Sequence, residues 1–323
     1  MGGSASPGCS QACCAHGDAS LDLKKANAEY LAKLDAEAAA ADQAAQREGG
    51  AILDDNLRAP GYFSSADISE LKDKYGGYSD KDQGERPVFS FKSGATYKGH
   101  WKGYMRHGFG IQQWADGAKY TGEWVNNYAC GKGVFEHTNG DSYIGQWKNN
   151  MADGMGIFYH KDTSTYRGQW CRDLQEGFGI EAWNEGAHYQ GTFRSGQKDG
   201  HGMYCWPDGC DYSGEWKGNF IHGMGSYKGR DGRGFQGCWV DSVIHGMGRY
   251  TWTDGRMYSG QYRADKKAGF GVYSCPDGKT YKGYWKDGKQ HGNGRYCIKD
   301  GDERAAKWVD GKRITDGDDY DSS

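Results

Sequence analysis

The chain has 323 residues, a formal net charge of −3, a pI near 6.4 and a mean hydropathy of −0.92. This balance gives no general attraction to nucleic acid, and no apolar run reaches the 18 or more residues that span a membrane. The ten cysteines show no Cys-x-x-Cys spacing, so we expect no metal site, no disulfide framework and no cofactor.

Residues 1–19 carry a sequence typical of lipid attachment. Gly2 follows the initiator methionine with Ser6 downstream, which fits N-myristoylation, and Cys9, Cys13 and Cys14 are candidate palmitoylation sites. One myristoyl chain binds membranes only reversibly, so a second acyl group would be needed for stable anchoring. No signal-peptide core is present. We expect a disordered acylated tail on the cytosolic face of a membrane; the alternative is an unmodified tail that matches a short motif by chance.

The next segments read as helix and linker. Residues 20–50 are rich in alanine, begin at a candidate N-cap, Ser20, and end at Gly49-Gly50, which predicts a helix that packs on a partner or serves as a solvated spacer. Residues 51–88 read as a linker that contains a short helix over residues 65–75, capped by Ser64 or Ser65. Residues 88–92 could add a starting strand to the segment that follows. At the other end, residues 315–323 form an acidic tail that we expect to be disordered.

Residues 89–314 are organised by one 23-residue pattern written nine times. We count the opening aromatic of each repeat as position 0; glycine then recurs at positions 2, 11 and 13, and all twelve tryptophans of the chain lie at positions 4 and 17. A fixed period of this length identifies a repeat array. A degenerate tenth unit, residues 304–314, retains Trp308 and is predicted to be a terminal cap. The repeats open at Tyr97, Tyr120, Tyr143, Tyr166, Tyr189, Tyr212, Phe235, Tyr258 and Tyr281.

Each repeat predicts a β-hairpin. Tyr97, Gly99 and Trp101 alternate with polar residues, which indicates a strand with one aromatic face. A second strand follows a short turn. Glycine beside the aromatics lets a ring lie flat over the backbone. The repeat closes on pairs such as Asp116-Gly117, which are typical of tight turns. We therefore predict an all-β, elongated antiparallel ribbon or solenoid of nine stacked hairpins, with strands of five or six residues, preceded by an N-terminal α-helical segment.

The repeat resembles the MORN (membrane occupation and recognition nexus) family, whose unit reads Tyr-x-Gly-x-Trp, a spacer, Gly-x-Gly and an Asp-Gly-like end. The segments YTGEW, YIGQW, YRGQW, YSGEW and YKGYW match this pattern outright. The resemblance implies a binding scaffold; similar proteins organise membrane-associated cytoskeleton, including cilia, and some pair through their terminal repeats. Related arrays are also fused to phosphatidylinositol phosphate kinases and lysine methyltransferases, but this sequence has no room for either catalytic domain.

No catalytic site emerges from the residues. Four histidines, of which His222 and His245 are the one adjacent pair, precede the glycine at position 11 and read as turn-packing residues and not metal ligands. Two surfaces are candidates for binding. The first is a row of cations at position 5, on the strand face opposite the aromatics, that could meet acidic lipid or an acidic partner: Lys102, Lys148, Arg194, Lys217, Arg263 and Lys286. The second is an aromatic groove formed by Tyr97, Trp101, Trp124, Trp147, Trp170, Trp216, Trp239 and Trp285.

The sequence thus favours a non-enzymatic, membrane-tethered scaffold that presents the repeats to cytoskeletal or signalling proteins. The expected location is cytoplasmic, peripheral on a membrane, with the cytoskeleton or cilium suggested by the resemblance. Two alternatives stay open: a targeting or regulatory subunit of a phosphoinositide kinase or another enzyme, and a module that binds phosphoinositide directly through the position-5 row. A homodimer through the terminal repeats is a further expectation, and nucleic acid is not an expected partner.

Overall fold

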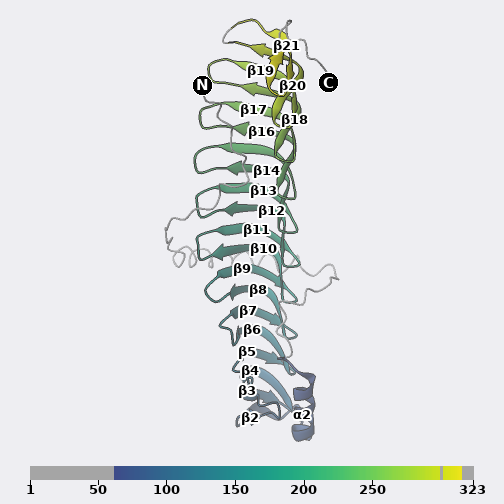
Figure 1. Ribbon diagram of the computed structural model, residues 1–323. Coiled ribbons are helices and arrows are strands. Elements are labelled where there is room, and N and C mark those ends of the chain that lie inside the picture. The colour runs from purple at the N-terminus through teal and green to yellow at the C-terminus, as the bar shows by residue number, and fades with distance from the viewer. Residues whose placement is uncertain (1–61, 299–300, 315–323) are drawn as a thin grey trace. The chain divides into compact units, whose positions relative to one another are not determined.

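The computed structural model describes residues 62–298 and 301–314, which fall in two compact units, residues 62–197 and 198–314 (Figure 1). The predictions for Gly2, Cys9, Cys13 and Cys14, for the helix over residues 20–50 and for the tail at 315–323 lie outside the described residues.

The first unit begins with the predicted short helix, α2 (Ser65–Tyr75). The hydroxyl of Ser64 accepts a hydrogen bond from the Ala66 amide at 3.0 Å and so caps the helix. Asp67 lies in the first turn, and Lys72 and Lys74 lie in the last turn, where each charge opposes the nearer end of the helix dipole. The capping prediction from Ser64 is confirmed.

The strands of the first unit form an antiparallel sheet in which each strand from β3 onward pairs with the next. Both β1 and β2 pair with β3, so they cover its outer edge. The strand β1 lies inside residues 76–87, which the sequence reads as linker. The strands are β1 (Gln83–Glu85), β2 (Phe89–Ser90), β3 (Thr96–Lys102), β4 (Met105–Gln113), β5 (Lys119–Val125), β6 (Tyr128–Glu136), β7 (Ser142–Lys148), β8 (Met151–Tyr159), β9 (Ser164–Cys171), β10 (Leu174–Trp183) and β11 (His188–Arg194).

The second unit continues the same antiparallel pattern, again with sequential pairing. Its last hairpin, β21 with β22, is the tenth unit that the sequence predicts as a cap. The strands are β12 (Gln197–Cys205), β13 (Asp211–Lys217), β14 (Phe220–Lys228), β15 (Gly234–Val240), β16 (Val243–Thr251), β17 (Met257–Arg263), β18 (Lys266–Ser274), β19 (Thr280–Lys286), β20 (Lys289–Cys297), β21 (Arg304–Val309) and β22 (Lys312–Ile314).

The strands of a repeat are longer than the predicted five or six residues. In the third repeat β7 has 7 residues and β8 has 9. They are joined by a two-residue turn at Asn149 and Asn150, whose φ angles of 51° and 69° are those of a tight hairpin turn. The register shifts between Gly145 and Trp147, and this β-bulge absorbs the difference in strand length.

Tight packing of tyrosine on glycine holds each hairpin together. The Tyr143 ring covers Gly145 and Gly156, and a Cβ added to Gly156 would lie 2.3 Å from the Tyr143 hydroxyl oxygen. That hydroxyl donates to the Gln146 carbonyl at 3.0 Å. The same bond forms in each of the eight repeats that open with tyrosine. The prediction that glycine admits a flat ring is therefore confirmed.

The tight turns also join successive hairpins. Asn150 Oδ1 accepts a hydrogen bond from the Ala129 amide at 2.7 Å, 21 residues earlier, and Asp265 Oδ1 accepts one from Ile244 at 2.9 Å in the second unit. These side chains stand at position 7, and they satisfy an amide of the preceding repeat. The pairs such as Asp116-Gly117 end the repeat differently: Trp114 and Ala118 close a wider loop, and Asp116 accepts from the Ala118 amide at 3.0 Å. The two-residue turn is thus at positions 6 and 7 and not at the Asp-Gly pair.

Candidate binding surfaces

The predicted aromatic groove residues form the floor of the aromatic face and are largely buried. Tyr97 is 0% exposed and Trp101 and Trp124 are 1% exposed in the first unit. The indole of Trp124 donates to the Gly110 carbonyl of the preceding repeat at 3.2 Å, and Trp147 and Trp170 repeat this bond. In the second unit Trp216 and Trp285 are buried and Trp239 is half-buried. In the second unit half-buried rings at positions 15 and 17, such as Tyr204 and Trp206, form an accessible part of this face.

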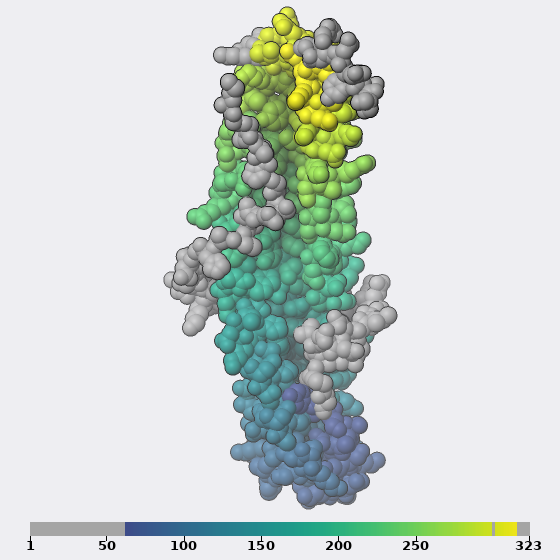
Figure 2. All heavy atoms as spheres, in the orientation of Figure 1, coloured from purple at the N-terminus to yellow at the C-terminus, as the bar shows by residue number. Residues whose placement is uncertain are grey.

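In the first unit a segment of the chain itself occupies this aromatic face. The Phe63 ring lies 5.3 to 6.3 Å, centroid to centroid, from five rings: Trp114, Tyr120, Trp124, Phe135 and Trp147. The indole of Trp114 donates to the Tyr62 carbonyl at 2.5 Å. Figure 2 shows α2, in purple, against the blue strands of the first repeats. Sequence reasoning missed this docking; the Tyr62-Phe63 pair just before the helix cap was the available signal.

A buried cation lies beside this segment. Arg106, at position 9, is 1% exposed, and its guanidinium lies 4.4 Å from the Trp124 ring centroid. Its amide and its side chain both bond to Asn127, and its guanidinium also donates to Gln112, which in turn donates to Asp67 of α2 at 3.4 Å. Burial lowers the pKa of Arg106 to about 10, and the charge of Asp67 opposes that shift. Burial also raises the pKa of Asp67, opposed by Arg106. The helix therefore brings a carboxylate to a buried cation.

In the second unit the aromatic face holds an open cavity of about 400 Å³. It lies among strands of the fifth to eighth repeats, and Trp206 and Tyr227 form one side of it, with ring centroids 5.9 Å apart. Ile221 and Ile244 supply its aliphatic lining. The cavity is thus mainly aromatic and apolar, a composition typical of sites that bind an apolar side chain.

A second cation stands on the aromatic face further along this unit. The Lys267 ammonium, also at position 9, lies 4.7 to 5.2 Å from the centroids of Trp252, Tyr258, Tyr273 and Trp285. Burial, with repulsion from Arg256, lowers its pKa to about 8. Position 9 varies between cations, alanine, glutamine and isoleucine, so no periodic signal points to it.

The residues of the predicted cation row differ in their surroundings. Lys102 pairs with Asp80 at 3.4 Å, whereas Lys148 and Arg194 are exposed in the first unit. In the second unit Lys217 is exposed, and Arg263 and Lys286 line one cavity of about 530 Å³.

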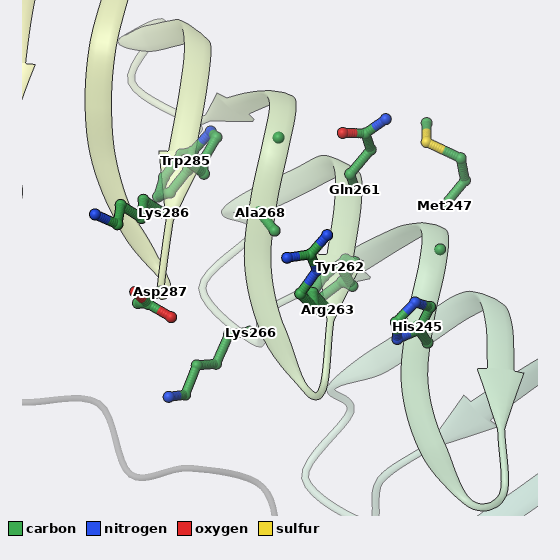
Figure 3. Close-up of a pocket in the computed structure, with 12 residues that line it drawn as sticks. His245, Met247, Gln261, Tyr262, Arg263, Lys266, Ala268, Trp285, Lys286 and Asp287 are labelled. Carbon is green, nitrogen blue, oxygen red and sulfur yellow. The ribbon is translucent and has the colours of Figure 1, made fainter.

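That cavity lies at the tight-turn edge of the sheet (Figure 3). Arg263 ends β17, Lys266 begins β18 and Lys286 ends β19, so three cations gather there. His245 also lines it, and Asp287 contributes the one carboxylate. The gathering of Lys266 with the position-5 residues was not evident from the sequence. Arg263, Lys266 and Lys286 are all exposed, so the site suits a solvated anionic group.

The histidines at position 10 contact the tight turns. His107 Nδ1 lies 3.4 Å from the Asn126 amide, and His291 Nδ1 lies 3.5 Å from an Asp310 carboxylate oxygen. This agrees with the turn-packing interpretation. Among the described residues, no group of three or more His, Cys, Asp or Glu side chains is placed to hold a metal ion. The described part of the chain also has no helix of the length and apolarity needed to cross a bilayer.

The MORN repeat model matches this chain nine times in succession, from residue 97 to residue 303, and the chain belongs to the MORN repeat family. The matched segments are 97–119, 120–142, 143–165, 166–188, 189–211, 212–232, 235–255, 258–280 and 281–303. Repeats of this family are modules that bind membranes or proteins and are not catalytic domains. The chain is therefore a repeat protein of the binding class, and protein partners are expected in general terms.

Other comparisons add solved structures of limited similarity. The E1021V mutant of the TCP10 domain of Danio rerio CPAP is 16% identical, with 71% of this chain and 98% of that chain covered and a TM-score of 0.35. The G-box domain of the microcephaly protein CPAP is 14% identical, with 70% and 100% covered and a TM-score of 0.33. No curated protein sequence matches the chain significantly.

Proposed function

We propose that this chain is a non-enzymatic, membrane-tethered adaptor that holds a cytoskeletal or signalling protein on its aromatic face. One observation carries the binding half of this proposal: the aromatic face of the first unit already holds a peptide segment, Tyr62–Tyr75, and the second unit offers an open aromatic cavity of about 400 Å³. A face that accommodates one segment through edge-to-face and tilted ring contacts is suited to accommodate another.

The tethering half rests on the sequence at Gly2 and on the three cysteines that follow it. Two acyl chains would hold the chain at a cytosolic membrane face, where the repeats would present the partner. Pairing of two copies through terminal repeats is part of the same proposal, and sedimentation velocity at micromolar concentrations tests it.

Replacing Gly2 by Ala removes the N-terminal glycine that the myristoylation motif requires, so we expect the variant to lose the acyl chain and to leave the membrane fraction. Intact-mass spectrometry of the natural protein should show one myristoyl and at least one palmitoyl addition. Gly8→Ala is the matched control, because it changes a glycine of the same tail outside the motif. An unmodified natural protein, or a Gly2→Ala variant that stays on membranes, would refute the tether.

A second candidate function is binding of an anionic phosphoryl headgroup at the basic cavity. The observation that favours it is the gathering of Arg263, Lys266 and Lys286 from three successive strands. Each cation near an anionic surface contributes about 1 kcal/mol, or about fivefold in affinity.

Vesicle flotation of the Gly2→Ala protein tests this candidate without the acyl chains. We expect binding to phosphatidylcholine vesicles that contain phosphoinositide, and about fivefold weaker binding for each of Lys266→Ala and Lys286→Ala. Lys217→Ala is the matched control, since Lys217 belongs to the same row but lies outside the cavity. Equal flotation of all these variants would eliminate the basic cavity as the site.

A further inference from the structure

The ring positions that hold Phe63 recur within the second unit. Each of the five rings around Phe63 has an aromatic counterpart 92 residues later, four repeat lengths along the chain. The counterparts of Trp114, Tyr120, Trp124, Phe135 and Trp147 are Trp206, Tyr212, Trp216, Tyr227 and Trp239. Four of these rings belong to the lining of the open cavity: Trp206, Trp216, Tyr227 and Trp239. The cavity is therefore the equivalent of the Phe63 site.

Part of the polar surroundings of the Phe63 site recurs with it, whereas Tyr204 stands at the position of the bridging Gln112. Lys198 stands at the position of Arg106, and Asn219 stands at the position of Asn127. The Lys198 amide donates to Asn219 Oδ1 at 2.9 Å, as the Arg106 amide donates to Asn127 Oδ1 at 2.8 Å. In the first unit the cation faces the carboxylate of Asp67 by way of Gln112. By repeat position, the second unit thus has a cation, Lys198, where the first unit has the arginine that is bridged to Asp67 of the docked helix.

A further copy of the ring set is closed by the chain itself. Trp252, Tyr258, Tyr273 and Trp285 correspond, 138 residues on, to four of the rings around Phe63, and the Lys267 side chain lies among them. Residue 129, the counterpart of Lys267 beside Phe63, is alanine, which leaves room for a ring from outside. In the open cavity the counterpart is Ile221, a shorter side chain than that of Lys267, and it belongs to the lining of the cavity.

We propose that the cavity of residues 204–265 binds a partner protein through two adjacent aromatic residues followed, four residues after the second, by a carboxylate at the start of a helix. This is the spacing of Tyr62, Phe63 and Asp67. The second aromatic ring enters between Trp206, Tyr227 and Trp239, the indole of Trp206 donates to the preceding carbonyl as Trp114 does to Tyr62, and Lys198 attracts the carboxylate. The proposal deepens the protein-binding half of the proposed function and rests on it.

The probe is a labelled synthetic peptide of residues 59–77 of this chain, titrated into the full-length protein and followed by fluorescence anisotropy. We expect saturable binding of one peptide per chain. Phe63→Ala in the peptide, or Trp206→Ala in the protein, should weaken binding about tenfold or more, because aromatic anchors in a pocket dominate such interfaces. Asp67→Lys in the peptide should weaken it as well, and Lys198→Glu in the protein should restore part of the loss.

Controls separate this site from its two equivalents. Trp252→Ala changes a tryptophan at the same repeat position, in the ring set that Lys267 fills, and should leave binding unchanged. Trp114→Ala reports on exchange with the docked Tyr62–Tyr75 segment. Tyr227→Leu keeps a large side chain, and it provides a second cavity variant if Trp206→Ala fails to show the native circular dichroism spectrum.

Three results would overturn the proposal. The first is the absence of saturable binding, and the second is binding that is abolished by Trp114→Ala but not by Trp206→Ala or Tyr227→Leu. The third is a full-length protein that dimerises through Phe63, because the occupant of the cavity would then be a second copy of the chain. These outcomes are separable from a failure of the tether, because the peptide assay is performed on unacylated protein. If other proteins still cross-link at the cavity while the peptide does not bind, the aromatic-acidic chemistry fails and the protein-binding function stands.

Discussion

Gly156→Ala is expected to lower the free energy of unfolding of the repeat array by about 2–3 kcal/mol, the upper part of the range of about 1–3 kcal/mol for overpacking a tight core. The added methyl group would overlap the Tyr143 ring, whose atoms would lie 2.3 to 2.5 Å away. The ring could clear the methyl group only by rotating off the backbone, and it would then lose the hydrogen bond from its hydroxyl to the Gln146 carbonyl. Urea unfolding followed by tryptophan fluorescence measures the change.

Gly77→Ala is the matched control for this experiment. A Cβ at Gly77 meets no atom within 4 Å, and the residue is not among those with positive φ. Its substitution should therefore change stability by no more than about 0.5 kcal/mol. If Gly156→Ala and Gly77→Ala proved equally mild, the tyrosine-on-glycine contact could not be what holds the hairpin.

Lys267→Met is expected to stabilise the protein at neutral pH by up to about 3 kcal/mol, and the gain should disappear as the pH rises toward 10. Burial lowers the pKa of Lys267 to about 8 in the folded protein, whereas an unfolded lysine titrates near 10.4. Between these values the unfolded chain binds more protons than the folded chain. Stability of the natural protein therefore rises with pH in this window, by at most about 1.4 kcal/mol per pH unit from this group.

The comparison must be made as a difference between two proteins. Burial raises the pKa of Tyr258, and it raises the pKa of Tyr212 to about 12, so deprotonation of unfolded tyrosines weakens the fold above pH 10 in both. Urea unfolding at pH 7, 8, 9 and 10 gives the difference directly. Lys266→Met, at the neighbouring exposed lysine, should show little change. A constant difference between Lys267→Met and the natural protein across this range would contradict the buried ammonium.

The repeat period explains why so much of the fold is predictable. A residue that recurs every 23 positions must have the same neighbours in each repeat, so the stripe of tyrosine, glycine and tryptophan predicts strands, faces and hairpins from the residues alone. The strand length is underestimated from the sequence because the residues of one repeat do not reveal the β-bulge near Gly145 or the two-residue turn that begins at Asn149. The Asp-Gly pairs predict a tight turn at the end of the repeat, because such pairs are typical of hairpin turns. The two-residue turn is formed instead by residues such as Asn149 and Asn150, which also adopt positive φ.

What differs between repeats is harder to predict. Arg106, Ile221 and Lys267 share position 9 but differ in role. Arg106 is a buried cation that is bridged to α2, Ile221 lines an open cavity, and Lys267 lies among the rings of its own ring set. Their roles depend on which segment docks beside them, and that information lies outside the repeat. The docking of Tyr62 and Phe63 is likewise a contact between distant parts of the sequence, 52 residues apart in the case of Tyr62 and Trp114.

The two edges of each sheet differ in what evolution can change. At one edge the turns are tightly constrained, since Asn150, and Asp265 at the same position, combine a left-handed backbone with a side-chain oxygen that bonds to the hairpin before them. An insertion there would break two hairpins at once. At the opposite edge the wider loops close through hydrogen bonds of their own backbone, as in the loop from Trp114 to Ala118. New recognition loops should therefore accumulate on that edge alone among relatives of this chain, while the other keeps its length.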